Sequence, residues 1–433
     1  MLLRIGFDDT DHYKGGCTTY LCSLIVERLE KKATFLDYPH LIRLNPNIPF
    51  KTRGNAAVAL KVECEDPEDV VDLVWNVISE NYSGKGKADP SLVAIKGEVP
   101  EEVKCLSMRA LHEFLPLSYV ARVLKKVNVE QRFIKRGRGL VGAAAAIGFL
   151  ESDFIDFTYE LLTYRNPEFW GKPRRVEYES IEVMDRALRP YVFANIDYKK
   201  KRPLILSHGP DPVIYGIRGD FPSLLVEAMK MIKVYEPIDR WIIFKTNQCT
   251  GVHLFMRKKI PVIRPYDSLT VRGIIVQSPI VIKGGHVLVK ISDGEKTIDC
   301  VFYKKTRLNV IATLIKPGDL IEVSGGVKPR RRGLTLNVEE VKIIQQVIVV
   351  EKKPPVCPIC GTKMKSKGKN LYRCRRCKYS AEFVDFEIRH RNLPKYPLKQ
   401  APSAYRHLTK PREREGLESF IKKGVLIERW HYP

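Results

Sequence analysis

The sequence predicts a multidomain protein of mixed α/β and α+β class, and three observations lead to that prediction. A chain of 433 residues is long enough for roughly three or four domains. Strand-like and helix-like patterns alternate through the N-terminal half, as they do in α/β and α+β domains. Short β-rich runs and two Cys-x-x-Cys pairs follow, which indicate a β-barrel and a zinc ribbon. We therefore expect domains at residues 1–195, 196–265, 266–350 and 351–433, with the first boundary left open to a discontinuous domain.

The charge of the chain favours a nucleic acid as partner. Its 74 Lys and Arg against 50 Asp and Glu give a formal net charge of +24. Such an excess attracts polyanions, although a generally basic cellular environment is the alternative explanation. No apolar run reaches the length of a membrane span and the N-terminus lacks a signal-peptide pattern, so we expect no membrane partner. Most of the ten cysteines are scattered, which fits a reducing cytoplasm.

An acidic loop follows the first predicted strand. Residues 2–7 alternate apolar side chains as a strand does, and Asp8, Asp9 and Asp11 come directly after them. Three carboxylates within four positions repel one another unless a cation lies among them. Mg²⁺ prefers oxygen ligands and typically takes one or two carboxylates plus substrate phosphates. We expect these aspartates to hold Mg²⁺ and to be catalytic; the alternative is an acidic loop that only caps a helix.

A helix is predicted after this loop and its glycine turn. Apolar residues recur at helical spacing over residues 21–30, so Thr18 and Thr19 stand at the helix start. Backbone N–H groups and the helix dipole favour a phosphate at that position. Thr18 is therefore a candidate phosphate acceptor and a fourth catalytic residue, unless it serves only as a cap.

A basic, glycine-rich loop at residues 135–148 is a second candidate phosphate site. Its glycines allow close approach of the backbone, and its Lys and Arg side chains supply positive charge. It is not a Walker A sequence, and an ordinary glycine-rich loop is the alternative. The predicted ATP- and phosphate-binding residues are Gly6, Lys135, Arg136, Gly137, Arg138 and Gly139.

The next unit shows a strand, a helix and a strand, at residues 210–219, 222–233 and 240–245. A polar stretch at residues 245–253 directly follows the last strand, and polar loops at strand ends often carry sites. An ordinary turn is the alternative. The candidate substrate residues in this unit are Asp211, Asn247, Gln248 and Thr250.

Residues 268–344 change to short β-rich runs separated by glycine-containing turns. Five such runs, at 269–276, 287–291, 297–302, 320–323 and 334–338, resemble an OB-fold, which binds single-stranded nucleic acid in a groove with stacking aromatic side chains. Phe302 and Tyr303 would supply the aromatic rings; a solvated basic rim on a structural barrel is the alternative. The predicted RNA-binding residues of this unit are Lys304, Lys305, Arg330, Arg331 and Arg332.

Two Cys-x-x-Cys pairs form the most specific local motif in the chain. Cys357 and Cys360, followed by Cys374 and Cys377, match a four-cysteine zinc ribbon in which no ligand position stays open, so the zinc should be structural. An iron–sulfur cluster is the alternative. Arg375 and Arg376, between the second pair, are further predicted RNA contacts. The basic tail after Phe386 is expected to lie along RNA or to form a solvated extension.

Taken together and in order, these motifs closely resemble those of the archaeal 2-agmatinylcytidine synthetases that modify the AUA-decoding isoleucine tRNA. The likeness covers nearly the whole chain. It rests on GFDDTDHYKGGCTTY (residues 6–20), RGNAAVA (53–59), RGRGLVGAAAAIG (136–148), GPDPVIYGIRG (209–219), KTNQCT (245–250) and the C-terminal ribbon.

The resemblance implies an ATP-dependent ligase that joins agmatine to C2 of the wobble cytidine of that tRNA, with ATP consumed to AMP and pyrophosphate. The modified anticodon then reads AUA instead of AUG. The N-terminal domain would be kinase-like and the second domain ferredoxin-like. The kinase-like domain would phosphorylate the C2 oxygen and a threonine of its own, which the CTTY match places at Thr18. A phosphorylated oxygen leaves more readily than a carbonyl oxygen, so an amine can displace it.

The resemblance also implies which residues meet the substrates. The aspartates at 8, 9 and 11 would serve metal and phosphate, and the residues at 211, 247, 248 and 250 would meet agmatine or cytidine. One stretch departs from the family pattern, in which KTNQ continues Gly-Thr-Asp; here Cys249, Thr250 and Gly251 follow. If that aspartate holds the guanidinium of agmatine, another carboxylate must replace it here.

Two other classes of function remain open at this point. A non-enzymatic nucleic-acid-binding protein could use the OB-fold and the ribbon, but it would leave the aspartate loop unexplained. A different ATP-using RNA enzyme, such as a ligase or nucleotidyltransferase, would be supported by a Lys-x-Asp-Gly motif, and none is evident in the N-terminal half.

Overall fold

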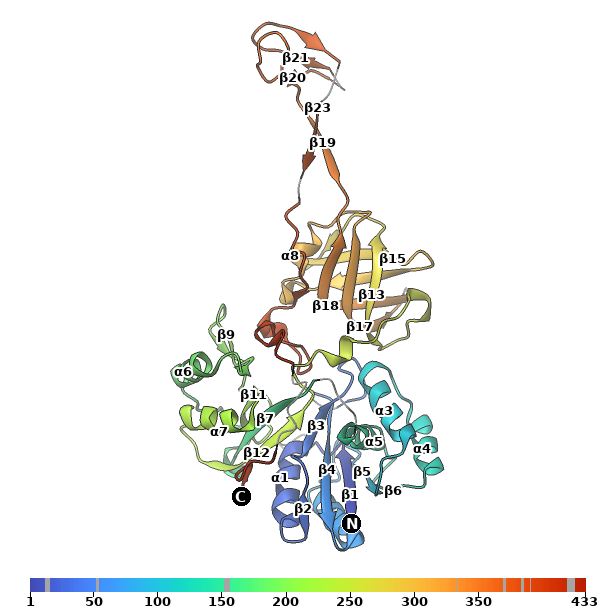
Figure 1. Cartoon of the computed structure of the whole chain (residues 1–433), viewed down its shortest axis with the longest axis vertical. Coiled ribbons are helices and arrows are strands. Elements are labelled where there is room, and N and C mark those ends of the chain that lie inside the picture. Colours follow the sequence, from blue (N-terminus) through green and yellow to red (C-terminus); the bar gives the residue numbers. More distant parts are fainter. Residues whose placement is uncertain are drawn as a thin grey trace.

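The computed structural model describes residues 1–11, 16–51, 54–151, 156–331, 333–368, 371–382, 385–389, 391–418 and 425–433. Figure 1 shows three parts in line: an α/β body that holds both termini, a β-barrel beside it, and a small β-rich part at the far end. A two-stranded ribbon joins the barrel to the far part, and it consists of β19 (Val349–Lys353) and β23 (Asp385–Arg389). The predicted multidomain α/β and α+β fold class is confirmed.

The body is built on one mixed sheet, which has 11 strands in the described part of the chain. Its order is β6-β5-β1-β4-β3-β12-β7-β11-β8, with β2 beside β4 and β25 beside β12. The two halves of the sheet meet where β3 and β12 pair in parallel, with His40 opposite Lys245. This sheet includes strands from both sides of residue 195, where a domain boundary was predicted. That boundary stays a prediction.

The strands of the body are β1 (Leu2–Asp8), β2 (Ala33–Phe35), β3 (His40–Arg43), β4 (Ala56–Cys64), β5 (Ser91–Lys96), β6 (Glu130–Phe133), β7 (Thr158–Arg165), β8 (Val192–Phe193), β11 (Val213–Gly219), β12 (Ile238–Thr246) and β25 (His431–Tyr432), and a small separate hairpin is formed by β9 (Ile196–Asp197) and β10 (Arg202–Pro203).

Helices cover both faces of the N-terminal half of this sheet. Leu3, Ile5 and Phe7 of β1 share a core with α1 and α2 on one face. On the other face, α5 lies so close to β1 that a Cβ atom on Gly6 would be 2.2 Å from the carbonyl oxygen of Ala143. The helices of the body are α1 (Thr18–Leu29), α2 (Pro67–Glu80), α3 (Glu101–His112), α4 (Leu117–Lys126), α5 (Leu140–Leu150), α6 (Tyr178–Leu188) and α7 (Pro222–Met231).

The barrel closes because β13 pairs with both β17 and β15. All five predicted β-rich runs are strands here, and β17 and β18 are longer than predicted because they form one continuous hairpin. The elements of this part are β13 (Ser268–Ile275), β14 (Ile280–Ile282), β15 (His286–Ser292), β16 (Thr297–Phe302), α8 (Asn309–Ala312), β17 (Leu320–Arg330) and β18 (Gly333–Gln345).

The far part is a small three-stranded sheet of β20 (Lys365–Ser366), β21 (Tyr372–Arg373) and β22 (Ser380–Ala381). After it, the chain turns back to the body. The strand β24 (Leu398–Lys399) pairs with β18 of the barrel, and β25 pairs with β12 in the body. Among the described residues, no helix is long and apolar enough to span a membrane.

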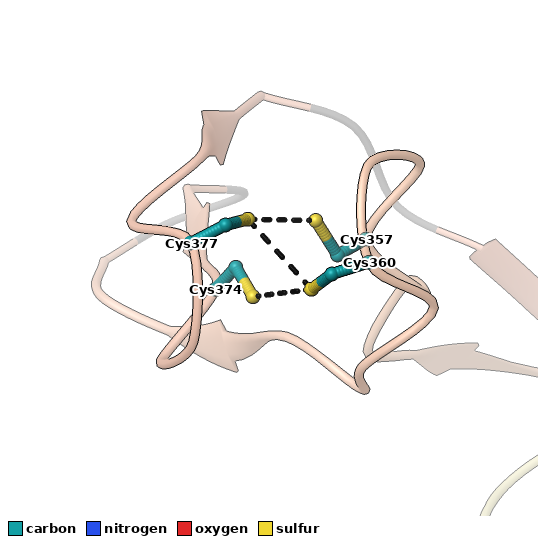
Figure 2. A group of neighbouring side chains, drawn as sticks. All are labelled: Cys357, Cys360, Cys374 and Cys377. Carbon is teal, nitrogen blue, oxygen red and sulfur yellow. Dashed lines mark hydrogen bonds between the residues drawn. The ribbon is translucent and has the colours of Figure 1, made fainter.

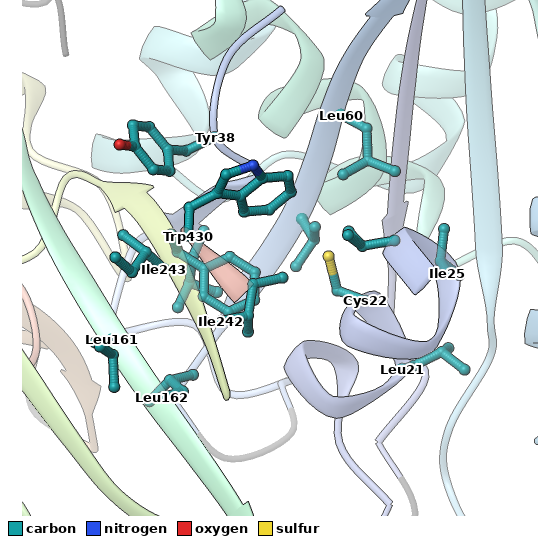
Figure 3. Packing of buried hydrophobic residues seen from close by; sticks show 14 of the residues in the cluster. Leu21, Cys22, Ile25, Tyr38, Leu60, Leu161, Leu162, Ile242, Ile243 and Trp430 are labelled. Carbon is teal, nitrogen blue, oxygen red and sulfur yellow. The ribbon is translucent and has the colours of Figure 1, made fainter. Parts of the chain in front are cut away.

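The returning chain corrects the expectation that the tail is a solvated extension, whereas contact of the tail with RNA stays a prediction. Trp430 is buried in the main core of the body, where its ring centroid lies 5.3 Å from that of Phe35 and 6.1 Å from that of Tyr38. Figure 3 shows Trp430 beside Ile242 and Ile243 of β12. Arg414 is also fully buried. Much of the tail is therefore part of the body, because its apolar and charged side chains find partners there.

Candidate functional site

The acidic loop begins where β1 ends beneath the first turn of α5. Asp8 is packed against that turn, since a Cβ atom on Gly142 would overlap its carboxylate. Burial, together with the neighbouring charge of Asp9, holds the pKa of Asp8 well above its usual value. Burial also raises the pKa of Asp9 to about 6, although Arg138 offsets part of this effect with a bond of 2.7 Å from Nε to Oδ2. Both carboxylates are thus costly to ionise unless a cation is near.

Asp11 and Thr18 meet at the start of α1. The Thr18 backbone N–H donates to Oδ1 of Asp11 at 3.2 Å, and the Thr18 hydroxyl lies 3.4 Å from the same oxygen. The hydroxyl of Thr10 donates to the Thr18 hydroxyl at 3.0 Å. The capping residue itself is Cys17, whose sulfur accepts from the N–H of Tyr20. Thr18 is therefore the first helical residue and not the cap.

The backbone of the basic loop is already bound by a carboxylate of the protein. Asp89 accepts hydrogen bonds from the N–H groups of Lys135, Arg136, Gly137 and Arg138, at 3.1–3.3 Å. The Asp89 side chain thus lies where the sequence predicts a phosphate. Sequence reasoning missed Asp89, because it is 46 to 49 positions away from its partners and no motif marks it.

The side chains and glycines predicted to bind phosphate make contacts within the protein. The Nζ atom of Lys135 donates to the carbonyl oxygens of Gly86 and Ala88, whereas Arg138 reaches Asp9. A side chain on Gly139 would collide with the carbonyl oxygens of Asp8 and Asp89, and Gly6 is packed against α5. Phosphate binding by Gly6, Lys135, Arg136, Gly137, Arg138 and Gly139 stays a prediction.

Two cavities lie beside the acidic loop. The smaller, of about 220 Å³, has Asp8, Asp9 and Arg138 at one side and apolar groups such as Phe50 and Phe114 at the other. The larger, of about 580 Å³, is called the Thr18 cavity here. It lies between the start of α1 and the loop before β11, and its lining includes Asp11, Thr18, Arg43, Glu160, Asp211 and His407. The two halves of the sheet therefore share this cavity.

Glu160 of β7 is the charged centre of the Thr18 cavity. Arg218 donates from Nε to its Oε1 at 3.0 Å, and Nη2 of Arg43 lies 3.9 Å from its Oε2. The side-chain amide of Gln248 also donates to Oε2. Sequence reasoning missed Arg43, Glu160 and Arg218, because isolated charged residues within β-strand patterns carry no local signal.

The predicted substrate residues divide into two groups. Asp211 lines the Thr18 cavity, where its carboxylate accepts from Ser207 Oγ at 2.6 Å and Arg174 Nη2 at 3.3 Å. Asn247, Gln248 and Thr250 do not line it and are buried. The side-chain amide of Gln248 donates to Glu160, and the hydroxyl of Thr250 donates to the carbonyl oxygen of Asn247. The side-chain amide of Asn247 bonds to the backbone of Arg43. These three residues hold the walls of the cavity, and direct substrate contact by any of the four stays a prediction.

The basic groups predicted to bind RNA are exposed where the structure describes them. Tyr303 lies beside His286 with 5.1 Å between ring centroids, and Arg330 donates to its hydroxyl at 3.4 Å. Phe302 is fully buried in the barrel core, so the expectation that it stacks on a base is wrong. Arg332 lies outside the described residues. The exposed predicted residues are Lys304, Lys305, Arg330, Arg331, Arg375 and Arg376.

The four cysteines of the ribbon converge as a metal site requires. Their sulfur atoms all lie within 4.8 Å of one another, with 3.3 Å between Cys357 and Cys377 and 3.4 Å between Cys360 and Cys374 (Figure 2). This arrangement fits the predicted structural zinc.

Among the described residues, these cysteines are the only group of three or more acidic, His or Cys side chains that converge in this way. Asp8, Asp9 and Asp11 therefore do not form a closed cage of carboxylates. One or two of them with substrate phosphates would still fit Mg²⁺, which seldom uses an all-protein cage.

Family models match most of the chain. Those described as the TiaS TCKD domain, the TiaS FLD domain and the TiaS C-terminal zinc ribbon domain match residues 4–136, 137–253 and 354–392. A model described as an OB-fold nucleic acid binding domain matches residues 269–344. The predicted OB-fold and zinc ribbon are thus confirmed.

Relatives and solved structures agree with these matches. The tRNA 2-agmatinylcytidine synthetase TiaS of Thermofilum pendens is 42% identical, and the match covers 98% of each chain. A crystal structure of TiaS in complex with its isoleucine tRNA and ATP has a TM-score of 0.84 at 35% identity, covering 95% of this chain and 97% of that chain. A crystal structure of TiaS with the same tRNA, AMPCPP and agmatine has a TM-score of 0.81 at 34% identity, covering 95% and 96%. The resemblance found in the motifs is confirmed, and the chain belongs to the TiaS family of tRNA 2-agmatinylcytidine synthetases.

Proposed function

We propose that this chain joins agmatine to C2 of the wobble cytidine of the AUA-decoding isoleucine tRNA in an ATP-dependent reaction, so that the anticodon reads AUA instead of AUG. Family membership over 98% of the chain supports this proposal. The observation that carries it is the Thr18 cavity, where the candidate phosphate acceptor and the carboxylates of Asp11, Glu160 and Asp211 line one space.

Phosphate transfer would take place on the side of the Thr18 cavity that carries the acidic loop. The hydroxyl of Thr18 stands at a helix N-terminus, which stabilises a phosphate after transfer. Asp8, Asp9 and Asp11 would hold Mg²⁺, which supplies charge neutralisation at the phosphates when it is bound. The smaller cavity, with its apolar wall of Phe50 and Phe114, suits the purine ring of ATP. Phosphorylation of the cytidine C2 oxygen then makes that oxygen a leaving group.

The other side of the Thr18 cavity suits agmatine, which carries a guanidinium and an amine. Asp211 and Glu160 are carboxylates, and a carboxylate binds a guanidinium through two parallel hydrogen bonds. Either can replace the aspartate that the family pattern has after KTNQ and that is absent here. Both carboxylates already accept hydrogen bonds within the protein, Glu160 from Arg218 and Gln248 and Asp211 from Ser207 and Arg174, so agmatine would share either carboxylate with these partners.

The tRNA would lie across the barrel and the ribbon. Exposed Lys and Arg side chains of both parts supply phosphate contacts, and the ring of Tyr303 offers a stacking surface on the barrel. ATP and tRNA meet in the cytoplasm, which is the proposed location of the reaction.

Turnover of labelled ATP tests this function against its rivals. We expect full turnover only when agmatine and the isoleucine tRNA are both present. A chain that binds tRNA without any ATP turnover would be a nucleic-acid-binding protein. Turnover with tRNA that ignores agmatine would indicate a different ATP-using RNA enzyme.

A further inference from the structure

The segment that returns from the ribbon brings a histidine into the Thr18 cavity. His407 lines this cavity together with Thr18 and Asp211. Its backbone is fixed, because its carbonyl oxygen accepts from the N–H of Cys249 at 2.8 Å and the next carbonyl accepts from the N–H of Gly251. The tail thus places an imidazole ring in the cavity, and no motif in the N-terminal part of the sequence indicates it.

A chain of hydrogen bonds sets which nitrogen of His407 carries the proton. Gln248 is fully buried, and its amide nitrogen donates to Glu160. Its amide oxygen therefore faces Nδ1 of His407, at 2.9 Å. An amide oxygen can only accept, so Nδ1 carries the hydrogen and Nε2 keeps its lone pair. Among the described residues, none forms a hydrogen bond with Nε2.

Gly54, another lining residue, packs closely against this ring. A Cβ atom at that position would be 3.0 Å from Nε2 and 2.6 Å from Nη1 of Arg43, so the absence of a side chain there lets the ring and the guanidinium take these positions. A basic lone pair in a cavity that also holds carboxylates for a cation is suited to receive a proton from that cation.

The charges around His407 keep the ring neutral. The positive charges of Arg43 on β3 and Arg218 on β11 lower the pKa of His407, and the contact with solvent that this exposed residue keeps limits the effect of burial on it. The carboxylates that line the same cavity are those of Asp11, Glu160 and Asp211. The lone pair is thus available throughout the neutral range.

We propose that Nε2 of His407 accepts the proton that the amine of agmatine releases as it attacks C2 of the activated cytidine. This inference rests on the proposed function. The amine is an ammonium ion near neutral pH, and without a proton acceptor its nitrogen has no lone pair for the attack. Proton transfer to Nε2 frees that pair, a C2–N bond forms, and the C2–O bond breaks. The oxygen leaves with its electron pair on the phosphoryl group that activated it, and the imidazolium returns the proton to solvent.

The decisive variant is His407→Asn. The Asn amide nitrogen takes the place of Nδ1 and keeps the hydrogen bond to Gln248, but no lone pair replaces Nε2. His431→Asn is the matched control, since His431 also lies on the returning chain and is bonded to Glu30 far from the cavity. Each protein is assayed at several pH values for Thr18 phosphorylation, tRNA affinity and the ligation rate. Agmatine is compared with an analogue whose amine is mostly uncharged because two fluorine atoms stand beside it.

We expect His407→Asn to keep Thr18 phosphorylation and tRNA affinity and to lose ligation by about 100-fold near neutral pH. The ligation rate of the variant should rise about tenfold per pH unit, as more agmatine loses its proton. The difluoro analogue should restore most of the ligation rate that the variant loses with agmatine. Ligation at the parental rate, or an equal loss with both amines, would overturn the role of His407. A parental protein that ligates no agmatine at all would overturn the proposed function instead.

Discussion

At the scale of single residues, the site is shaped by carboxylates with very different surroundings. Asp8 is buried under α5, Asp9 is paired with Arg138, and Asp11 holds the first residue of α1. Asp89 binds the backbone of the basic loop and so fixes its shape. The adjacent aspartates of the acidic loop are therefore not interchangeable, and Asp11 is the one in contact with the candidate phosphate acceptor.

The first prediction concerns Thr18. We expect ATP and Mg²⁺ alone to place a phosphate on Thr18, because its hydroxyl stands beside Asp11 at a helix N-terminus. Thr18→Ala should abolish this phosphate and sharply reduce tRNA modification, at a cost in stability of about 1 kcal/mol. Phosphopeptide mass spectrometry measures the first effect, with Thr19→Ala as the control. A Thr18→Ala protein that modifies tRNA at the parental rate would leave Thr18 only a structural role.

A second prediction at this scale concerns His40, a buried residue of β3 at the junction between the two halves of the sheet. Burial lowers the pKa of His40 to about 4, while an unfolded histidine titrates near 6.5. Below pH 6.5 the unfolded chain takes up a proton that the folded chain does not, so the free energy of unfolding falls as the pH falls. The loss attributable to His40 should reach about 3 kcal/mol near pH 4.

Urea unfolding at pH 7 and pH 4.5 measures this effect against the variant His40→Asn. The Asn amide can donate to the carbonyl oxygen of Tyr38, as Nδ1 of His40 does at 3.0 Å. We expect the variant to lose less stability than the parental protein on acidification. Equal losses would show that His40 is not the group that titrates.

At the scale of elements, the returning segment does the most to join the parts of the molecule. It pairs with β18 of the barrel and β12 of the body, and it lends His407 to the Thr18 cavity. A chain cut before the barrel would lose these contacts along with the RNA-binding parts. Removal of the tail therefore tests folding as well as binding.

The third prediction tests the anchor of this segment. Arg414 is fully buried, and its guanidinium binds both Asp156, at 2.5 Å, and Asp220, at 3.0 Å. Arg414→Met would remove the nearest cation from both buried carboxylates, while Lys410 stays 3.7 Å from Asp156, so we expect a loss of about 3–5 kcal/mol in the free energy of unfolding. Arg412→Met, at an exposed position two residues earlier, should change stability by less than about 0.5 kcal/mol. Equal effects of the two substitutions would contradict the assignment.

The fourth prediction concerns the zinc ribbon. We expect one zinc ion per chain by elemental analysis of protein purified without chelator. Cys374→Ser should weaken tRNA binding, while phosphorylation of Thr18 persists, because the ribbon lies at the far end of the molecule from the acidic loop (Figure 1). Cys105→Ser is the control, since Cys105 is exposed and not part of the cluster. Zinc-free protein with normal tRNA affinity would rule out this role.

At the scale of the whole molecule, the local elements followed from the sequence and their partners did not. Alternating apolar residues predicted β1, and Asp66 with Pro67 predicted the start of α2, where Asp66 accepts two backbone N–H groups. The cysteine spacing predicted the metal cluster. The parallel pairing of β3 with β12 and the return of Trp430 to the core could not be predicted, because periodicity reports which side of an element is buried but not against what.

The same limit explains which site residues were found. Asp8, Asp9, Asp11 and Thr18 lie within one short motif, so a local pattern marks them. Glu160 and His407 reach the cavity from distant strands and from the tail, and their chemistry depends on Gln248 lying between them. Only the fold brings these three together.

The most direct test of the account is the mass of the tRNA after reaction. The isoleucine tRNA with a wobble cytidine is incubated with the protein, ATP, Mg²⁺ and agmatine, digested with nuclease and analysed by mass spectrometry. We predict that the anticodon fragment gains the mass of agmatine less one water, that the gain lies on the wobble cytidine, and that it disappears without ATP or with a uridine at that position. An unchanged wobble cytidine in the complete reaction would contradict the account.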